Sequence, residues 1–461
     1  MLLYKLIERI FNLDVALNKI SQFFWGPWTI SFMLFAGVWF SFKLKFFQIF
    51  KIHIWLSNTI GRIIKTKNKN FQNNNNKGIS SFQAVSTALA GCVGTSNIVG
   101  VGLAIAIGGA GSLFWMWVAA FFGMMTSFAE NVLAVKYRQT DDNGNFYGGP
   151  MIYIEKGMKC KALAIAFSIS CIFVSFCGGN MTQSNAMSTA INEIFKIPTF
   201  LIGLINALLV ALVIFGGIQR ISKVSEKLVP IMSAVYVFFG IIIMLLNFNK
   251  IFDVFSIILS SAFDFRAVGG SLFSCAAMKT LRSGISRGLS SNEAGLGSSP
   301  IIYAATKTKE LATQGMWGIF QVFVDTLVVC NITGFCILIT GVDQNENYNL
   351  LGQAAFNSVF GPFGNVLLNL ILILFAFSTI ISCAYQGERC VEYVFGRKYI
   401  ALYKIINICM TIIGSISKIN LVWEICDIFN ALMMILNLSA VLFLSDQVVK
   451  IMEKYLKTKP I

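Results

Sequence analysis

A polar, glycine-rich phrase occurs twice in this chain. Residues 95–102 read TSNIVGVG and residues 290–297 read SSNEAGLG, so both copies share the pattern Ser-Asn-x-x-Gly-x-Gly. The second copy starts 195 residues after the first. Each glycine weakens a helix by about 1 kcal/mol relative to alanine, and unwound backbone exposes carbonyl and N–H groups. Exposed carbonyls suit a small cation, and the N-terminus of the next half-helix suits a carboxylate.

The two copies supply the first candidates for ligand contact. Thr95, Ser96 and Asn97 stand in the first interruption, and Asn292 is the asparagine of the second. Close helix packing through small residues is the structural alternative for a single glycine cluster. The repetition of the polar Ser-Asn pair favours a binding site.

Two further polar stretches interrupt apolar runs. Asn180 and Gln183 are candidates for polar contacts to a substrate, with hydrogen bonding between helices as the alternative. Ser378 and Thr379 are adjacent hydroxyls that could ligate a small hard cation. Their alternative is back-bonding to the preceding helical turn, which the sequence alone favours.

Charged residues inside the apolar runs are also informative, since each costs about 2.5–3.5 kcal/mol at the centre of a membrane helix. Glu130 and Asp325 are separated by the same offset of 195 residues. Arg287 and Glu293 flank the second interruption and are expected to pair across it. A structural or gating ion pair is favoured over a proton relay.

The elements that position these residues are membrane helices. Hydrophobic residues make up 56% of the 461 residues and charged residues only 12%, which a water-soluble core cannot accommodate. The single histidine and the absence of any Cys-x-x-Cys pair exclude a histidine-based metal site, a catalytic triad and zinc templates. The basic residues lie in short loops, so the net charge of +15 does not indicate nucleic-acid binding.

Apolar runs of about 20 residues predict eleven spans. A leading span lies near 22–42, and ten core spans follow near 80–109, 111–137, 161–190, 199–217, 222–247, 268–305, 314–341, 353–384, 399–417 and 421–446. The sixth core span is too long for one simple crossing, so we expect it to be bent or broken. With the N-terminus outside, cytoplasmic segments hold 25 lysines and arginines and outer segments hold 7, as the positive-inside rule requires.

The offset of 195 residues holds about five spans, an odd number, so the second copy enters the membrane from the opposite face. The predicted organisation is therefore an inverted repeat. Its parts are an amphipathic segment (1–20), a leading span and basic linker (21–79), a first repeat (80–247), a second repeat (248–446) and a cytoplasmic tail (447–461).

The residues resemble the alanine or glycine:cation symporters, a branch of the amino acid–polyamine–organocation superfamily. The motifs that carry the resemblance span the chain from about residue 20 to 445. They are Gly94–Ile98, Gly148–Met151 with Tyr153–Glu155, Gly179–Met181, Gly216–Ile221, Arg287–Gly288, Ser291–Ser298, Asp325–Thr326 and Asp427–Asn437.

The resemblance implies an all-α membrane protein with a leucine-transporter-like fold of five plus five inverted spans and one extra N-terminal span. It also implies sodium-coupled uptake of a small amino acid, with proton coupling in some members. Thr95 and Ser96 would meet the substrate carboxylate, and Gln183 with the stretch from Met278 to Gly284 would shape the pocket.

The resemblance also implies where sodium would bind. Ser378 and Thr379 match the hydroxyl pair of that fold's common sodium site, completed by carbonyls near Ala90 and Val93. The chain departs from the family at Ser96, usually Gly, and at Cys92, usually Thr. These departures leave alanine, glycine, serine and glutamine open as substrates.

The sequence therefore predicts a secondary transporter in the cell membrane, with sodium as coupling ion and no cofactor, and with membrane lipid but no nucleic acid as partner. The rivals are a proton-coupled or glutamine- or serine-selective symporter and, more distantly, an ion channel. Channels usually use symmetric filter rings, whereas this chain has one asymmetric pair of interruptions. An enzyme is not expected, because no nucleophile motif is present. The oligomeric state is left open, and a monomer is compatible with the sequence.

Overall fold

The computed structural model describes residues 17–62, 78–141, 144–263, 275–344, 350–417 and 420–458. Over these residues the chain is almost wholly helical. The strands within the described residues are β1 (Gln139–Thr140) and β2 (Phe146–Tyr147), which form one antiparallel pair. Most of the expected amphipathic segment 1–20, and the low-complexity stretch 65–77, lie outside the described residues.

Within the described residues, eight helical stretches are long and apolar enough to cross a bilayer. They are Leu17–Lys43, which contains α2 (Pro27–Lys43); α8 (Ser112–Tyr137); Lys161–Phe195, made of α10 (Lys161–Phe176), η2 (Cys177–Met181) and α11 (Thr182–Phe195); α13 (Gly217–Leu246); Leu311–Thr340, made of α17 (Leu311–Val322), η4 (Phe323–Cys330) and α18 (Asn331–Thr340); α20 (Pro362–Phe395); Arg397–Ile416, which contains α21 (Ile400–Ile416); and Leu421–Phe443 in α22 (Asn420–Phe443).

The other three predicted spans are also helical. The first core span is the pair α6 (Ser81–Cys92) and α7 (Val99–Gly108), joined by η1 (Thr95–Asn97) and bent by 63°. The fourth is α12 (Thr199–Ile214), which is apolar but short. The sixth consists of α15 (Cys275–Asn292) and α16 (Ser298–Tyr303), so the expected break in that span is confirmed.

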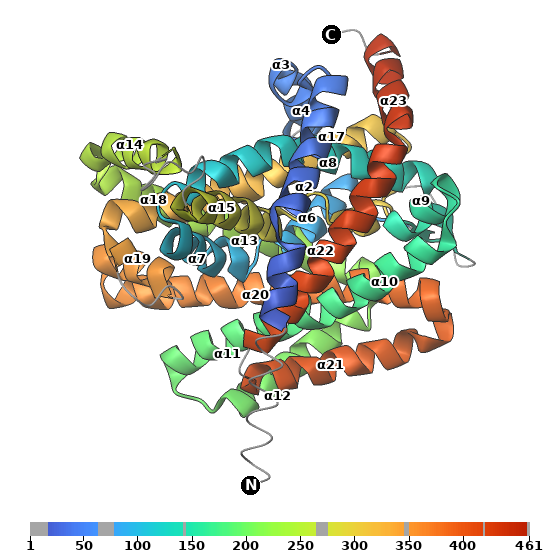
Figure 1. Cartoon of the computed structure of the whole chain (residues 1–461). Coiled ribbons are helices and arrows are strands. Elements are labelled where there is room, and N and C mark those ends of the chain that lie inside the picture. The colour runs from blue at the N-terminus through green and yellow to red at the C-terminus, as the bar shows by residue number, and fades with distance from the viewer. Residues whose placement is uncertain are drawn as a thin grey trace.

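The remaining elements are short and lie between the spans, except η7 (Arg397–Tyr399) at the start of the span Arg397–Ile416 and α23 (Ser445–Thr458) after the last span. Those between the spans are α3 (Phe47–Phe50), α4 (Ile52–Asn58), α9 (Pro150–Gly157), η3 (Phe248–Lys250), α14 (Ile251–Ala262), η5 (Val342–Gln344) and α19 (Leu351–Phe360). Figure 1 places α14 and α19 at the left end of the molecule and α9 at the right end. Of these, α14 and α9 belong to connections predicted for opposite faces of the membrane, and they lie at opposite ends of the helices. Most of α19 was instead predicted as the start of the eighth core span, which in the structure begins at Pro362 of α20.

The peripheral helices turn apolar side chains outward, as lipid-facing helices do. In α12, Leu204, Leu208 and Leu212 repeat every four residues and are 41%, 62% and 57% exposed. The opposite face carries Gly203, where an added Cβ would lie 2.9 Å from the Cβ of Ser415 on α21. Small residues allow this close approach between membrane helices.

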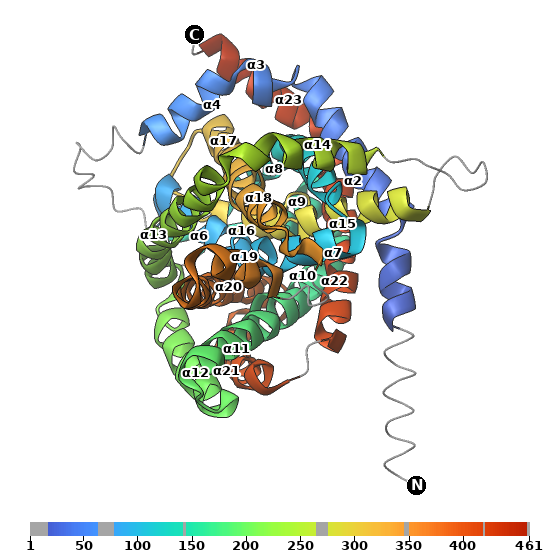
Figure 2. The same ribbon diagram turned by 90° about the vertical axis from the view of Figure 1, so that its left-hand side faces the viewer.

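The interrupted helices lie at the centre of the bundle. Figure 2 shows α6 and α16 in the middle, with α13, α20, α10 and α22 around them. All residues of α6 from Ala84 to Cys92 are buried. The unwound residues Val93 to Thr95, and Asn97, are buried as well. Unwound backbone is thus shielded from lipid, as it must be because lipid offers it no hydrogen-bond partner.

Candidate functional site

The first interruption begins where α6 loses its backbone hydrogen bonds. Val93 leaves the helix with ψ near 89°, and Gly94 is extended. The Gly94 N–H donates to the side-chain oxygen of Asn97 at 2.9 Å, rather than to the carbonyl of Ala90 one turn back. The Ala90 carbonyl is therefore available to another partner.

That partner is Thr379 of α20, whose hydroxyl lies 3.0 Å from the Ala90 carbonyl oxygen. The same hydroxyl lies 3.0 Å from the carbonyl oxygen of Phe375, to which Ser378 donates at 2.8 Å. Two carbonyl and two hydroxyl oxygens thus gather between α6 and α20, and both side-chain hydroxyls are buried. Such a set of neutral oxygens can ligate a hard monovalent cation.

The structure places Thr379 against Ala90, two of the residues that the family resemblance had grouped, and the neighbouring Ser378 hydroxyl bonds Phe375. Val93 lies at the end of α6, three residues beyond Ala90, and no side chain is seen bonded to its carbonyl within the described residues. Both hydroxyls also reach the carbonyl of Phe375, three and four residues earlier, so the back-bonding that the sequence favoured for this pair is present. The additional contact of Thr379 with the Ala90 carbonyl goes beyond that alternative.

A cavity of about 850 Å³ opens beside the first interruption. Thr95, Ser96 and Gly100 line it at the start of α7. A Cβ added at Gly100 would meet only the Cβ of Ser96, at 3.6 Å, so this glycine leaves the cavity wall open. The other walls come from α11, α15 and α22, including Asn185, Thr189, Lys279, Arg282, Ser283, Ser286, Arg287, Ser290, Glu424 and Asp427.

Gln183 positions the first interruption from α11. Its side-chain oxygen accepts from the Thr95 hydroxyl at 3.1 Å and lies 3.4 Å from the Thr95 backbone nitrogen. Its amide nitrogen donates to the carbonyl of Gly178 in the π-helical turn η2, at 3.2 Å. Gln183 is 4% exposed and is not among the residues that line the cavity, so it acts on the cavity through Thr95.

Asn97 does not reach the cavity. It is fully buried, and its amide nitrogen donates to a carboxylate oxygen of Asp325 in η4 at 2.7 Å. Asn292 behaves in a related way: its amide donates to the Thr326 hydroxyl at 3.0 Å, and that hydroxyl donates to Asp325 at 3.0 Å. Both asparagines of the repeated phrase therefore hold the interruptions, and neither lines the cavity, in contrast to their expected contact with a ligand.

Asn180 forms hydrogen bonds between helices, which was the alternative to a polar contact with a substrate. Its amide nitrogen donates to the backbone and side-chain oxygens of Asn407 on α21, at 2.9 and 2.8 Å. The side chain is fully buried between helices and does not line the cavity.

The stretch from Met278 to Gly284 is only partly on the cavity wall. Met278 and Gly284 are not among the lining residues. A Cβ at Gly284 would lie 2.2 Å from the backbone oxygen of Ser112, so this glycine lets α15 pack closely against α8. The lining residues of this stretch are instead Lys279, Arg282 and Ser283.

The expected pair of Arg287 and Glu293 is not formed. Arg287 lies 3.7 Å from a carboxylate oxygen of Asp427 on α22. Glu293 adopts a left-handed backbone conformation, with φ of 57°, and accepts a hydrogen bond from Ser298 at the start of α16. The turn that ends α15 therefore directs Glu293 along the chain rather than back toward Arg287.

Glu130 holds the second interruption. Its carboxylate accepts from the backbone N–H of Gly295 at 3.2 Å and from the amide of Asn437 on α22, which also bonds the Gly295 carbonyl at 2.9 Å. Glu130 in the first half contacts the interruption of the second half, and its counterpart Asp325 contacts the interruption of the first. The two acidic residues that are 195 positions apart therefore each hydrogen-bond the interruption of the opposite half.

Sequence reasoning found only the first part of the polar face of α15, within the stretch from Met278 to Gly284, and missed Ser286 and Ser290. Lys279, Arg282, Ser283, Ser286, Arg287 and Ser290 all line the cavity. Their spacing of three or four residues marks one face of a helix, and this periodicity was visible in the sequence.

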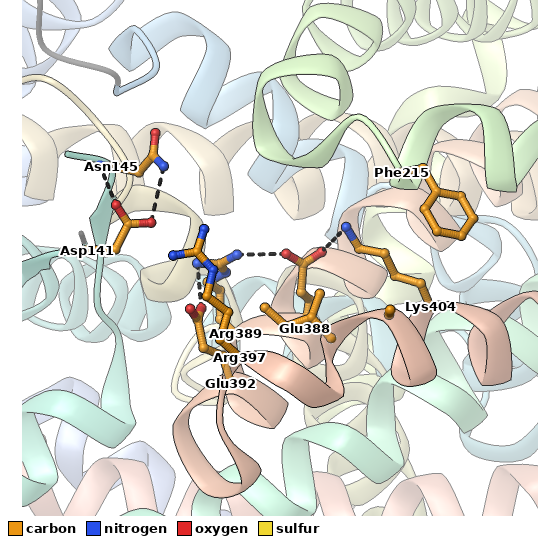
Figure 3. A pocket seen from close by; sticks show the side chains of 10 residues that line it. Asp141, Asn145, Phe215, Glu388, Arg389, Glu392, Arg397 and Lys404 are labelled. Carbon is orange, nitrogen blue, oxygen red and sulfur yellow. Dashed lines mark hydrogen bonds and ion pairs between the residues drawn. The ribbon is translucent and has the colours of Figure 1, made fainter. Parts of the chain in front are cut away.

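A second cavity, of about 380 Å³, lies where α20 meets α21. Figure 3 shows its charged lining, in which Glu388 pairs with Arg389 at 2.7 Å and with Lys404 at 3.1 Å. Arg389 also pairs with Glu392, at 2.6 Å. These opposite charges compensate one another, so the cluster joins two helices at this end of the bundle.

Two interrupted helices at the centre of a membrane bundle, with a polar cavity at one break, define a secondary transporter rather than an enzyme. A family model for the sodium:alanine symporter family matches residues 11–460, and the chain belongs to this family. The sodium/alanine symporter AgcS of Methanococcus maripaludis is 39% identical, covering 94% of this chain and 95% of that protein. A Bacillus subtilis protein named as a probable sodium/glutamine symporter, GlnT, is 32% identical over 97% of this chain and 91% of its own length.

The fold also matches a solved structure. MhsT in complex with L-phenylalanine superimposes with a TM-score of 0.57 at 15% identity, covering 80% of this chain and 90% of that one. The leucine-transporter-like fold expected from the sequence is thereby confirmed.

Proposed function

We propose that this protein imports a small neutral amino acid together with sodium. Its membership of the sodium:alanine symporter family supports this proposal, as does the name of the relative AgcS. The observation that carries the proposal is the first interruption, which offers a cavity on one side and a cluster of neutral oxygens on the other.

The substrate would bind at the start of α7. Backbone N–H groups at a helix N-terminus favour a carboxylate, and Ser96 and Gly100 border the cavity at this point. The hydroxyl of Ser96 can donate to the same carboxylate, while Gln183 fixes the adjacent Thr95. An alanine-sized substrate would lie between this end of α7 and the polar face of α15.

Sodium would bind between α6 and α20. The carbonyls of Ala90 and Phe375 and the hydroxyls of Ser378 and Thr379 would be its ligands, with the Val93 carbonyl completing the set. Ion and substrate would then occupy two sides of one unwound segment, so either would order the segment for the other. A membrane potential of 100 mV contributes about 2.3 kcal/mol per sodium, which corresponds to about fifty-fold accumulation.

The cavity would face outward. Its mouth includes Asn18, Glu193 and Leu350, which belong to segments predicted to be external from the lysine and arginine distribution. This orientation places the N-terminus outside and the C-terminus in the cytoplasm of a cell-membrane protein. Transport by alternating access would close this mouth and open the opposite end as the helices with the two interruptions rock against the others.

Uptake into proteoliposomes tests the proposal. Radiolabelled alanine should accumulate when sodium is high outside, and should not accumulate when sodium is equal on both sides. A proton gradient imposed without sodium distinguishes the proton-coupled alternative. Uptake that responds to neither gradient would contradict symport, and single-channel conductance carried by sodium alone would favour the channel.

A further inference from the structure

The side-chain hydroxyls of three serines on the cavity wall make no hydrogen bond within the part of the chain that the structure describes. Ser96 lies in the first interruption, and Ser286 and Ser290 lie on the polar face of α15. The neighbouring hydroxyl of Ser283, by contrast, donates to the Ala104 carbonyl of α7 at 3.2 Å.

Ser290 differs from the other two because its hydroxyl oxygen is buried and has no partner. Leaving a buried hydroxyl unpaired is unfavourable, so such a group in a native structure calls for an explanation. Ser290 lines the cavity although its hydroxyl is turned away from the open space, and rotation about the Cα–Cβ bond would bring the hydroxyl to a bound molecule that can provide the missing partner.

The position of Ser290 relates it to the side chain of the substrate. Ser290 is two residues before Asn292, where α15 ends, and α15 packs against both η1 and α7. The carboxylate is proposed to bind at the start of α7. A short substrate side chain directed across the cavity would therefore reach the last turn of α15.

We propose that Ser290 selects substrates whose side chain carries a hydrogen-bonding group close to Cβ, with L-serine as the smallest example. This inference rests on the proposed amino-acid transport and deepens it by naming the substrate class. A serine hydroxyl would pair with Ser290, whereas the methyl group of alanine would leave it unpaired. Sites built to hydrogen-bond a substrate hydroxyl discriminate against analogues that lack it.

The charges of the cavity agree with a neutral substrate. Lys279, Arg282 and Arg287 on α15 are accompanied by Glu193, Glu424 and Asp427 from α11 and α22. Neither sign of charge dominates the wall. The discriminating contact is therefore assigned to a neutral hydroxyl, and the side chain that it recognises is polar and uncharged.

The test compares sodium-driven uptake of serine and alanine by the full-length protein in proteoliposomes. We expect the native protein to prefer serine about tenfold in kcat/KM, equivalent to about 1.4 kcal/mol, and Ser290→Ala to remove most of that preference while still transporting alanine. Ser290→Thr, which restores a hydroxyl, should recover part of it. Ser283→Ala is the matched control on the same helix face and should change both substrates by the same factor.

The outcomes separate this inference from the proposed function. If alanine and serine both enter with sodium and Ser290→Ala leaves their ratio unchanged, the inference is overturned and the transport function stands. If neither amino acid is transported by the native protein, both the proposed function and this inference fail. Purified Ser290→Ala is also examined by thermal unfolding, so that a loss of folding is recognised.

Discussion

The amide of Asn97 donates to the carboxylate of Asp325 at 2.7 Å, and this bond joins the first interruption to the other half of the chain. Asp325 also accepts from the Ser291 hydroxyl at 2.8 Å, beside the second interruption. One buried carboxylate therefore holds both unwound segments. These hydrogen bonds to one carboxylate would make the two interrupted helices move together when the transporter changes state.

Replacing Asp325 by alanine should destabilise the protein. Asn97, Ser291 and Thr326 would lose their acceptor inside the membrane, and unpaired buried donors cost about 1–3 kcal/mol each. Thermal unfolding of the purified protein in detergent should show a clearly lowered Tm. Asp253→Ala, which removes an exposed acid on α14, is the control and should leave the Tm unchanged. An Asp325→Ala variant as stable as the native protein would show that the hydrogen bonds to Asp325 do not hold the interruptions.

Removing the Thr379 hydroxyl should weaken sodium binding more than it weakens the fold. Thr379→Val keeps the shape of the side chain but deletes one proposed sodium ligand next to the Ala90 carbonyl. The sodium concentration for half-maximal uptake should rise by about tenfold, equivalent to about 1.4 kcal/mol. Thr340→Val is a suitable control, because that hydroxyl donates to the Cys336 carbonyl within its own helix. An equal response of the two variants to sodium would remove Thr379 from the site.

Two glycine-to-alanine substitutions should have different effects, one on substrate binding and the other on stability. An alanine at Gly100 has room, so Gly100→Ala should fold normally but raise the KM for substrate by about tenfold, since one methyl group in a binding pocket is worth about 1–3 kcal/mol. Gly284→Ala brings a Cβ against the Ser112 backbone and should lower the Tm, because overpacking costs about 1–3 kcal/mol. Uptake and unfolding are measured on both proteins. A normal KM for Gly100→Ala would place the substrate elsewhere.

The sequence was sufficient for much of the fold, because hydrophobic runs and repeated glycines are local signals. It located both interruptions, and the family resemblance grouped Ala90 with Thr379, which the structure places in contact. It failed where the partner lies far along the chain. Asp427, and not the nearby Glu293, faces Arg287, because backbone geometry at the end of α15 decides where a charge points.

The roles of polar groups in membrane helices could not be predicted either, because their partners also lie far along the chain. Asn180 bonds another helix, whereas Ser290 lines the cavity, and neither outcome follows from residue type. The regular spacing of polar residues on α15 could have indicated a helix face that borders a water-filled cavity. Only the packing of α15 against α7 and α8 shows which of those residues border the cavity.

The orientation of the cavity can be tested by labelling. Lys279→Cys places a thiol on the cavity wall, and a membrane-impermeant thiol reagent should modify it from outside intact cells. Lys307→Cys, exposed in the connection between α16 and α17, should react only after the cytoplasmic face is opened to the reagent. The native protein sets the background from its own cysteines. Reaction of Lys307→Cys alone from outside would reverse the proposed orientation.

The central claim is that sodium and the amino acid bind on two sides of one unwound segment. Their binding should then be coupled, and the coupling must be reciprocal. The most direct measurement is equilibrium binding of labelled serine or alanine to the purified protein over a range of sodium concentrations, together with sodium binding over a range of amino acid. We predict that each ligand raises the affinity for the other by the same factor, and that Thr379→Val reduces this factor. Amino-acid affinity that is independent of sodium would contradict the account.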